Sequence, residues 1–196
     1  MLLQRRFWIL LIVLLFDGFA GLSRAQNLDP TLYQYYTSGG IHSGLKTDSA
    51  NHFTLNGKPL VIYGGTLHYF RHLPEYWPRI LRSYRAAGLN SVQLYVPWNM
   101  HEDTPGHFDF QSPGLNLDKL LQLIKQEDMF VVIRPGPFIN AEYDFGGLPS
   151  WLLRDSRMRT RTNYGPYMER VKLYWNEVMK IINKHQFVKG KFRSTF

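Results

Sequence analysis

The sequence predicts an α/β fold in which helices cover a parallel sheet. Three short apolar stretches have the length and composition of buried strands, and each is followed by a segment whose apolar residues recur at helical spacing. Proline and glycine stand where these stretches end. Apolar strands that alternate with amphipathic helices are typical of successive β-α units.

The first strand is predicted from the stretch at residues 60–70, which starts with a continuous apolar run. Gly64 and Gly65 suit a bend or a close backbone approach where this strand ends. Pro74 opens the helix, because proline is tolerated in a first helical turn, and Gly88 ends it. The apolar face of this helix consists of Trp77, Ile80, Leu81 and Tyr84.

The second and third strands are predicted at residues 91–98 and 129–135. Asn116 can cap the helix between them, and the apolar positions of that helix are Leu117, Leu120, Leu121 and Ile124. After the third strand we expect a short helix around Trp151 and then a long helix. The wide apolar stripe of the long helix contains Tyr167, Val171, Tyr174, Trp175, Val178, Ile181 and Ile182.

Residues 1–25 are predicted to be a secretory signal peptide. Arg5 and Arg6 precede an unbroken apolar run at 7–16, which is shorter than the about 20 residues that a spanning helix needs. Cleavage is predicted after Ala25, and the mature chain is then expected in the lysosome or outside the cell, with no membrane segment. The alternative is an uncleaved N-terminal anchor.

The mature chain is long enough for one domain. Residues 26–50 are polar without a sustained period and are predicted to be a loose leader, and residues 51–190 are predicted to be the domain itself.

Loss of the signal peptide leaves 20 basic and 14 acidic residues, so the formal net charge falls from +8 to +6. This mild, scattered charge argues against a nucleic-acid partner, and the densest basic cluster is interpreted as a solvated face. That cluster is Arg154, Arg157, Arg159 and Arg161. The chain has no cysteine, which excludes disulfides and thiolate metal sites.

Periodicity alone leaves the closure of the sheet open between a barrel and a doubly wound sheet. A doubly wound sheet that binds dinucleotides carries GxGxxG after its first strand. Gly64 and Gly65 are followed by Thr66, Leu67 and His68 and do not make that motif.

Three motifs carry a specific resemblance to a known family: LHYFR at 67–71, QLYVPWNMHEDTPGHFDF at 93–110 and RPGPFINAEYDFGGLPSWL at 134–152. Together they resemble the N-terminal part of the catalytic barrel of the family 35 glycoside hydrolases, the β-galactosidases, over residues 54–190. The resemblance implies the first three or so βα units of a (β/α)8 TIM barrel, a fold of about 250 residues. It also implies a β-galactoside or glycan substrate, removal of terminal non-reducing β-D-galactose with retention, and no cofactor.

The resemblance places Tyr95, Asn140, Ala141 and Glu142 in the galactose subsite. Glu142 is expected to accept hydrogen bonds from sugar hydroxyls. Without the resemblance, Tyr95 would be interpreted as a core aromatic residue and Glu142 as a surface carboxylate. Pro135, Pro137, Gly146 and Gly147 stiffen the loop around Glu142, which favours a deliberate placement.

Retaining glycosidases need two carboxylates about 5 to 5.5 Å apart. Glu102 and Glu142 are not interpreted as that pair, because the family's acid/base glutamate lies just beyond the point where this chain reads HQFVKG at 185–190, and its nucleophile lies further on. The chain is therefore expected to be a truncated form that lacks both and is inactive alone, with residues 191–196 as an aberrant tail. A non-catalytic galactose-binding protein and a fragment without function are the alternatives.

No metal site is expected in this sequence. His101 and His107 lie near Glu102 and Asp103, but their spacing does not fit HExxH. His68 is interpreted as a packed residue behind the subsite.

Overall fold

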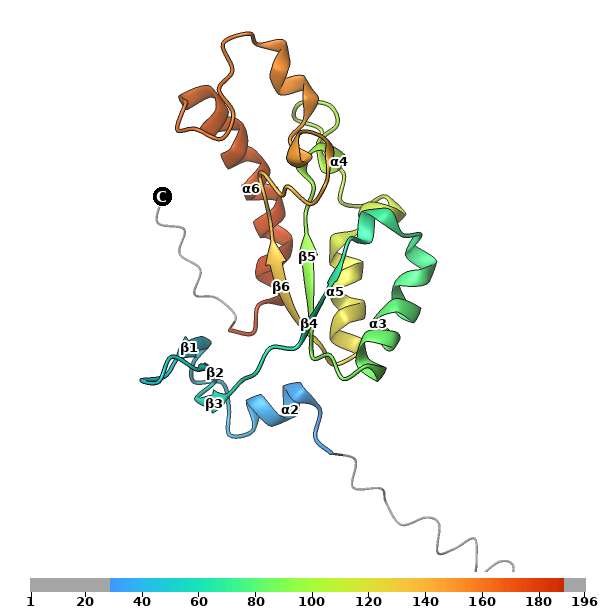
Figure 1. Cartoon of the computed structure of the whole chain (residues 1–196), viewed down its shortest axis with the longest axis vertical. Helices are drawn as coiled ribbons and strands as arrows, with labels where there is room; N and C mark the ends of the chain where they lie inside the picture. Colours follow the sequence, from blue (N-terminus) through green and yellow to red (C-terminus); the bar gives the residue numbers. More distant parts are fainter. Residues whose placement is uncertain (1–28, 189–196) are drawn as a thin grey trace, which may run out of the picture. The chain divides into compact units, whose positions relative to one another are not determined.

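Three parallel strands form the central sheet of the computed structural model, which describes residues 29–188. All helices and strands of this part belong to the unit Leu32–Phe196. The strands are hydrogen-bonded in the order in which they follow one another along the chain (Figure 1). They are β4 (Gly64–Leu67), β5 (Ser91–Tyr95) and β6 (Phe130–Arg134). The predicted α/β class with a parallel sheet is confirmed, although β4 is shorter than the stretch predicted for it.

Three amphipathic helices pack on this sheet, and α5 contacts both α3 and α6. They are α3 (Trp77–Ala86), α5 (Leu117–Gln126) and α6 (Gly165–His185). Asn116 caps α5 as predicted, since its side-chain oxygen accepts from the Lys119 backbone N–H at 2.9 Å. The predicted apolar stripes of α5 and α6 enter one core with the strands, and only Trp175 among them stays half-buried.

The helices cover one face of the sheet. Val92 and Leu94 of β5 are fully buried in the core, and because side chains alternate along a strand, Gln93 and Tyr95 point to the opposite face. On that opposite face Val132 of β6 is 41% exposed. Polar residues at the ends of the strands are therefore accessible on the face that the helices leave uncovered.

The prediction of a loose leader is wrong for part of residues 26–50. Residues Leu32–Thr37 form helix α2 and Leu45–Thr47 form strand β1. Tyr36 of α2 packs with Leu55 and Leu60, and its hydroxyl donates to the Pro59 carbonyl at 2.8 Å. These partners come later in the sequence, so the segment itself shows no period. Strand β1 pairs with β2 (Phe53–Leu55), and β2 pairs with β3 (Lys58–Pro59), both antiparallel.

Short helical segments connect the main elements. They are η2 (Tyr69–Arg71), η3 (Pro74–Tyr76), α4 (Trp98–His101), η4 (Pro113–Leu115), η5 (Asp144–Gly147) and η6 (Ser150–Arg154). The short helix predicted around Trp151 is thus present as the 3-10 helix η6.

The predicted signal peptide at 1–25, its cleavage after Ala25 and the predicted tail at 191–196 lie outside the described residues. Within residues 29–188, no helix is both long enough and apolar enough to cross a membrane.

Candidate functional site

The ends of the three strands place polar side chains in one row at the carboxyl edge of the sheet. The register pairs Leu67 with Leu94 and Tyr95 with Arg134, so His68, which follows β4, comes beside Tyr95. The ring centroids of His68 and Tyr95 are 5.2 Å apart. Tyr95, which the family resemblance predicts to be in the subsite, therefore lies in the middle of the row, between His68 and Arg134.

The hydroxyl of Tyr95 accepts hydrogen bonds from neighbouring side chains. Arg134 Nη1 donates to Tyr95 Oη at 2.8 Å, and Gln93 Nε2 donates to the same oxygen at 3.4 Å. The Arg134 guanidinium also lies over the Tyr95 ring, 4.5 Å from its centroid, as is common for cation–π pairs. The ring is half-buried on the uncovered face of the sheet.

His68 joins the two parts of the predicted site. Burial and the nearby positive charge of Arg71 lower the pKa of His68, while Glu142 opposes this effect. The imidazole is therefore neutral near pH 7, and Glu142 lies within electrostatic range of it. His68 Nδ1 is buried and has no hydrogen-bond partner within residues 29–188. Unpaired buried polar atoms are rare in proteins. The interpretation of His68 as a packed residue behind the subsite stays a prediction.

The predicted binding residues after β6 form a left-handed turn. Asn140, Ala141 and Glu142 have φ angles of 61°, 57° and 46°. This conformation is unfavourable for residues with a Cβ, and alanine and glutamate rarely adopt it. The Asn140 carbonyl accepts from the Tyr143 N–H at 3.1 Å. Such local strain is typical of functional sites in which surrounding contacts hold the backbone.

Arg71 supplies such contacts. Its Nη2 donates to the carbonyls of Ala141 at 2.8 Å and Glu142 at 3.2 Å. Its guanidinium lies 5.5 Å from the Phe70 ring centroid and 5.9 Å from that of Tyr143. Arg71 therefore fixes the turn that carries Glu142. Sequence reasoning included Arg71 in the LHYFR motif but assigned it no role.

Two glycines after the turn pack closely against the residues that precede it. A Cβ on Gly146 would come within 1.9 Å of the Phe138 ring, and a Cβ on Gly147 within 2.9 Å of Ile139. Both glycines have positive φ. On Phe138 lies the Arg161 guanidinium, 4.0 Å from the ring centroid, so one member of the predicted solvated cluster has a packing contact.

Glu102 and His101 have structural partners. Glu102 is 1% exposed. Its Oε2 accepts from Trp98 Nε1 at 2.6 Å, and its Oε1 accepts from the Gly106 N–H at 2.7 Å. His101 Nε2 is 2.6 Å from the Tyr69 hydroxyl. No group of three potential metal ligands among His, Cys, Asp and Glu occurs in the part of the chain that the structure describes.

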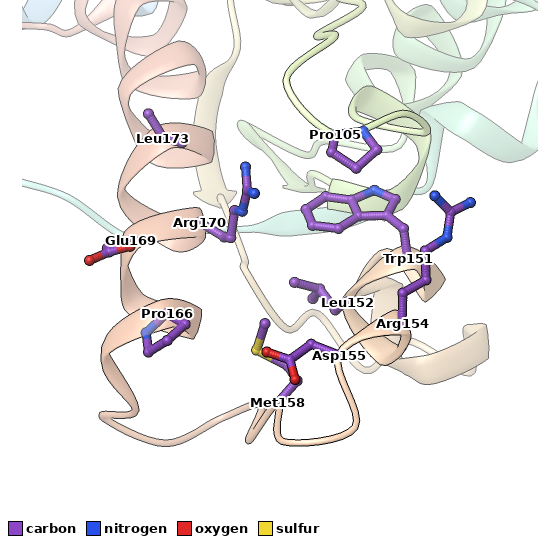
Figure 2. Close-up of a pocket in the computed structure, with 10 residues that line it drawn as sticks. All are labelled: Pro105, Trp151, Leu152, Arg154, Asp155, Met158, Pro166, Glu169, Arg170 and Leu173. Atoms are coloured by element: carbon purple, nitrogen blue, oxygen red, sulfur yellow. The ribbon is translucent and has the colours of Figure 1, made fainter.

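A separate cavity of about 530 Å³ lies between η6 and the first half of α6. Trp151 lies between Arg170 of α6 and Arg154 of η6, and Leu152 lies below its ring in this view (Figure 2). The Trp151 Nε1–H donates to the Glu102 carbonyl at 2.8 Å. Neither Tyr95 nor the turn at 140–142 lines this cavity.

The site thus combines an exposed carboxylate, a phenol and a neutral imidazole at the carboxyl ends of parallel strands. Enzymes with such sheets bind their substrates at this edge. The Glycosyl hydrolases family 35 profile matches residues 52–191. The chain belongs to this family.

Named relatives agree with this assignment. Beta-galactosidase-1-like protein 2 of Homo sapiens is 43% identical over 147 residues, which cover 75% of this chain and 23% of that protein. Beta-galactosidase 17 of Arabidopsis thaliana is 44% identical over 131 residues, which cover 66% of this chain and 18% of that protein. The chain spans less than a quarter of the length of either relative.

A solved structure shares the fold at low sequence identity. The endo-1,4-beta-mannanase from Rhizomucor miehei superposes with a TM-score of 0.52 and 14% identity, over 74% of this chain and 43% of that chain. At this identity the likeness concerns the fold alone.

Proposed function

We propose that Tyr95, Asn140, Ala141 and Glu142 form part of the galactose subsite of a retaining β-galactosidase. The observation that carries this proposal is a pair of contacts after β4: the His68 ring packs on Tyr95, and Arg71 donates hydrogen bonds to the carbonyls of Ala141 and Glu142. These contacts support the proposal, because they bring Tyr95 of β5 and the turn after β6 next to the same short segment, residues 68–71. Membership of the family and the names of the relatives supply the substrate class.

The chemistry of the residues fits a sugar. Glu142 is exposed, and a carboxylate accepts strong hydrogen bonds from hydroxyl groups. The Tyr95 ring offers an apolar face beside this acceptor. Rigid placement of the turn by Arg71 limits the entropy that Glu142 loses when a ligand binds.

We place these residues in the first three units of a (β/α)8 barrel. The sequential order of β4, β5 and β6 and the packing of α5 against both α3 and α6 support this proposal. In a barrel all helices cover the outer face of the sheet, and helices on one face are what residues 29–188 contain. The inner face then carries Gln93, Tyr95 and Arg134.

In this proposal the acid/base and the nucleophile belong to later strands of the family's barrel. Glu102 is unsuited to either role, because it is buried and both of its oxygens accept hydrogen bonds from structural donors. The 196-residue chain alone is accordingly expected to bind galactose without hydrolysing galactosides. We further propose that it enters the secretory pathway and reaches the lysosome or the extracellular space.

The test uses the purified 196-residue chain. Titration with galactose, followed by NMR, should show saturable binding that Glu142→Gln weakens by about tenfold or more. Glu169→Gln, which neutralises an exposed carboxylate on α6, is the matched control and should bind like the parent. Absence of binding by a folded parent chain would contradict the subsite assignment.

A fluorogenic β-galactoside separates the remaining alternatives. Hydrolysis that survives purification and disappears in Glu142→Gln would make Glu142 catalytic. A stable monomer that binds galactose without hydrolysis, and no longer transcript across the codons for residues 189–196, would favour a non-catalytic galactose-binding protein. Rapid degradation of the chain in cells would favour a fragment without function.

A further inference from the structure

Tyr95 Oη is surrounded by groups that donate hydrogen bonds. Arg134 Nη1 lies at 2.8 Å and Gln93 Nε2 at 3.4 Å. A guanidinium has five N–H groups and no acceptor, so in its contact with Arg134 the phenol oxygen must be the acceptor. The direction of this hydrogen bond is therefore known without any ligand.

In the second contact, with Gln93, the Tyr95 oxygen is again the acceptor. Gln93 Oε1 accepts from the Thr66 hydroxyl at 3.3 Å, which leaves the Gln93 NH2 group to face Tyr95. Thr66, Gln93 and Tyr95 thus form a chain of hydrogen bonds that runs from β4 to β5, and Arg134 of β6 approaches the phenol from the other side. A hydroxyl oxygen has two lone pairs, so it can accept from both of these donors.

The phenolic proton has no acceptor within residues 29–188. The ring that carries it is held on two sides, since its centroid is 5.2 Å from that of His68 and 4.5 Å from the Arg134 guanidinium carbon. The proton must therefore point away from Arg134 and Gln93, toward the open face of the site.

We propose that Arg134 is a positioning residue that makes the Tyr95 hydroxyl a hydrogen-bond donor to the sugar. The inference rests on the proposed galactose subsite and specifies how that subsite recognises its ligand. The sugar atom that meets Tyr95 is an acceptor, and its own proton is not needed there. Glu142 requires the opposite, because a carboxylate accepts from a sugar hydroxyl that must keep its proton.

The binding test uses the 196-residue chain with galactose and its 2-, 3-, 4- and 6-deoxy and deoxyfluoro derivatives. Fluorine can accept a weak hydrogen bond but cannot donate one. At one ring position, the one that faces Tyr95, the fluoro sugar should bind several-fold more tightly than the deoxy sugar, which should lose about tenfold relative to galactose. At positions that face Glu142, both derivatives should bind equally weakly.

Variants then assign the selectivity to particular residues. In Tyr95→Phe the difference between the fluoro and deoxy sugars should disappear. Arg134→Met should reduce the difference in affinity between the fluoro and deoxy sugars. Arg134→Lys, which keeps a donor, should retain part of this difference. Gln93→Glu places an acceptor beside the phenol and should reduce it as well, whereas Gln93→Met should have a smaller effect. A change in overall affinity with unchanged selectivity in Arg134→Met would overturn the positioning role.

A neutron structure of the deuterated chain tests the inference without a ligand. The deuteron on Tyr95 Oη should point away from Arg134 Nη1 and Gln93 Nε2. A deuteron directed at Gln93 would overturn the inference, whatever the chain binds. A deuteron in the expected direction, together with a folded chain that binds no galactose, would support the geometry and contradict the proposed function alone.

Discussion

Arg71 holds the backbone of Glu142, a residue that lies 71 positions later in the chain, through a hydrogen bond of 3.2 Å from Nη2 to the carbonyl oxygen. The same nitrogen bonds the Ala141 carbonyl. The bond brings the loop after β6 to the end of β4. The orientation of the Glu142 carboxylate therefore depends on a side chain from another unit of the fold.

Replacement of Arg71 should loosen the turn and leave the core intact. In Arg71→Ala we expect galactose affinity to fall by about tenfold, because the left-handed turn loses two charge-assisted bonds. Amide hydrogen exchange at residues 139–146 should become faster, while exchange in α5 stays unchanged. Arg154→Ala removes an exposed arginine of η6 and is the control. Unchanged amide hydrogen exchange at residues 139–146 in Arg71→Ala would show that the turn does not depend on Arg71.

The regular part of the fold was predictable because its signals are local. The period of the apolar residues in α5 and the Asn116 cap both lie within one stretch of sequence, and the structure confirms them. Helix α2 was missed because Tyr36 finds its partners, Leu55 and Leu60, on segments that come later. Short helices carry too few residues to show a period.

The site was predictable only in outline. Family motifs indicated Tyr95 and Glu142, but the positive φ angles at Ala141 and Glu142 have no sequence signal, since neither residue favours that conformation. The role of Arg71 depends on a contact between segments 70 residues apart. Gly146 and Gly147 were a sequence signal for an unusual backbone, and both have positive φ.

Gly146→Ala should destabilise the loop strongly. The added Cβ would lie 1.9 Å from the Phe138 ring at a φ of +61°, so either the ring or the backbone must move. We expect a loss of about 1 to 3 kcal/mol in the free energy of unfolding. Gly114→Ala is the matched control, because a Cβ there meets nothing within 4 Å. Equal thermal midpoints for the two variants would contradict the close packing of Phe138 on Gly146.

His101 should make the stability of the fold depend on pH. Burial lowers the pKa of His101 from its ordinary 6.5 to about 4. Below pH 6.5 the unfolded chain binds a proton that the folded chain does not bind until about pH 4. The contribution of His101 is therefore complete above pH 6.5 and is lost as the pH falls toward 4, by on the order of 3 kcal/mol.

Chemical unfolding at several pH values measures this loss. In His101→Gln the decrease in unfolding free energy between pH 6.5 and pH 4.5 should be smaller than in the parent chain. His107→Gln, at an exposed position in the same segment, should keep the decrease of the parent. An identical pH dependence in all three chains would show that His101 does not cause it.

The subsite can be tested most directly in a protein that also contains the remaining strands of the family's barrel. In such a protein, Glu142→Gln and Tyr95→Phe should each lower kcat/KM toward a β-galactoside. Each removes a positioned contact whose loss costs about 1 to 3 kcal/mol, or roughly ten- to two-hundred-fold in rate. Glu142→Gln should have the larger effect, because a charged acceptor binds sugar hydroxyls more strongly than a phenol does.

The folded fraction must be measured in the same samples, by circular dichroism and thermal unfolding. Glu142 is exposed and Arg71 bonds its backbone rather than its carboxylate, so Glu142→Gln should leave the fold unchanged and its effect should be confined to the sugar. Glu169→Gln on α6 is again the control for loss of one negative charge. If Glu142→Gln kept the kcat/KM of the parent at an equal folded fraction, the turn at 140–142 would not contact the galactose, and the site would have to be sought elsewhere along the edge of the sheet.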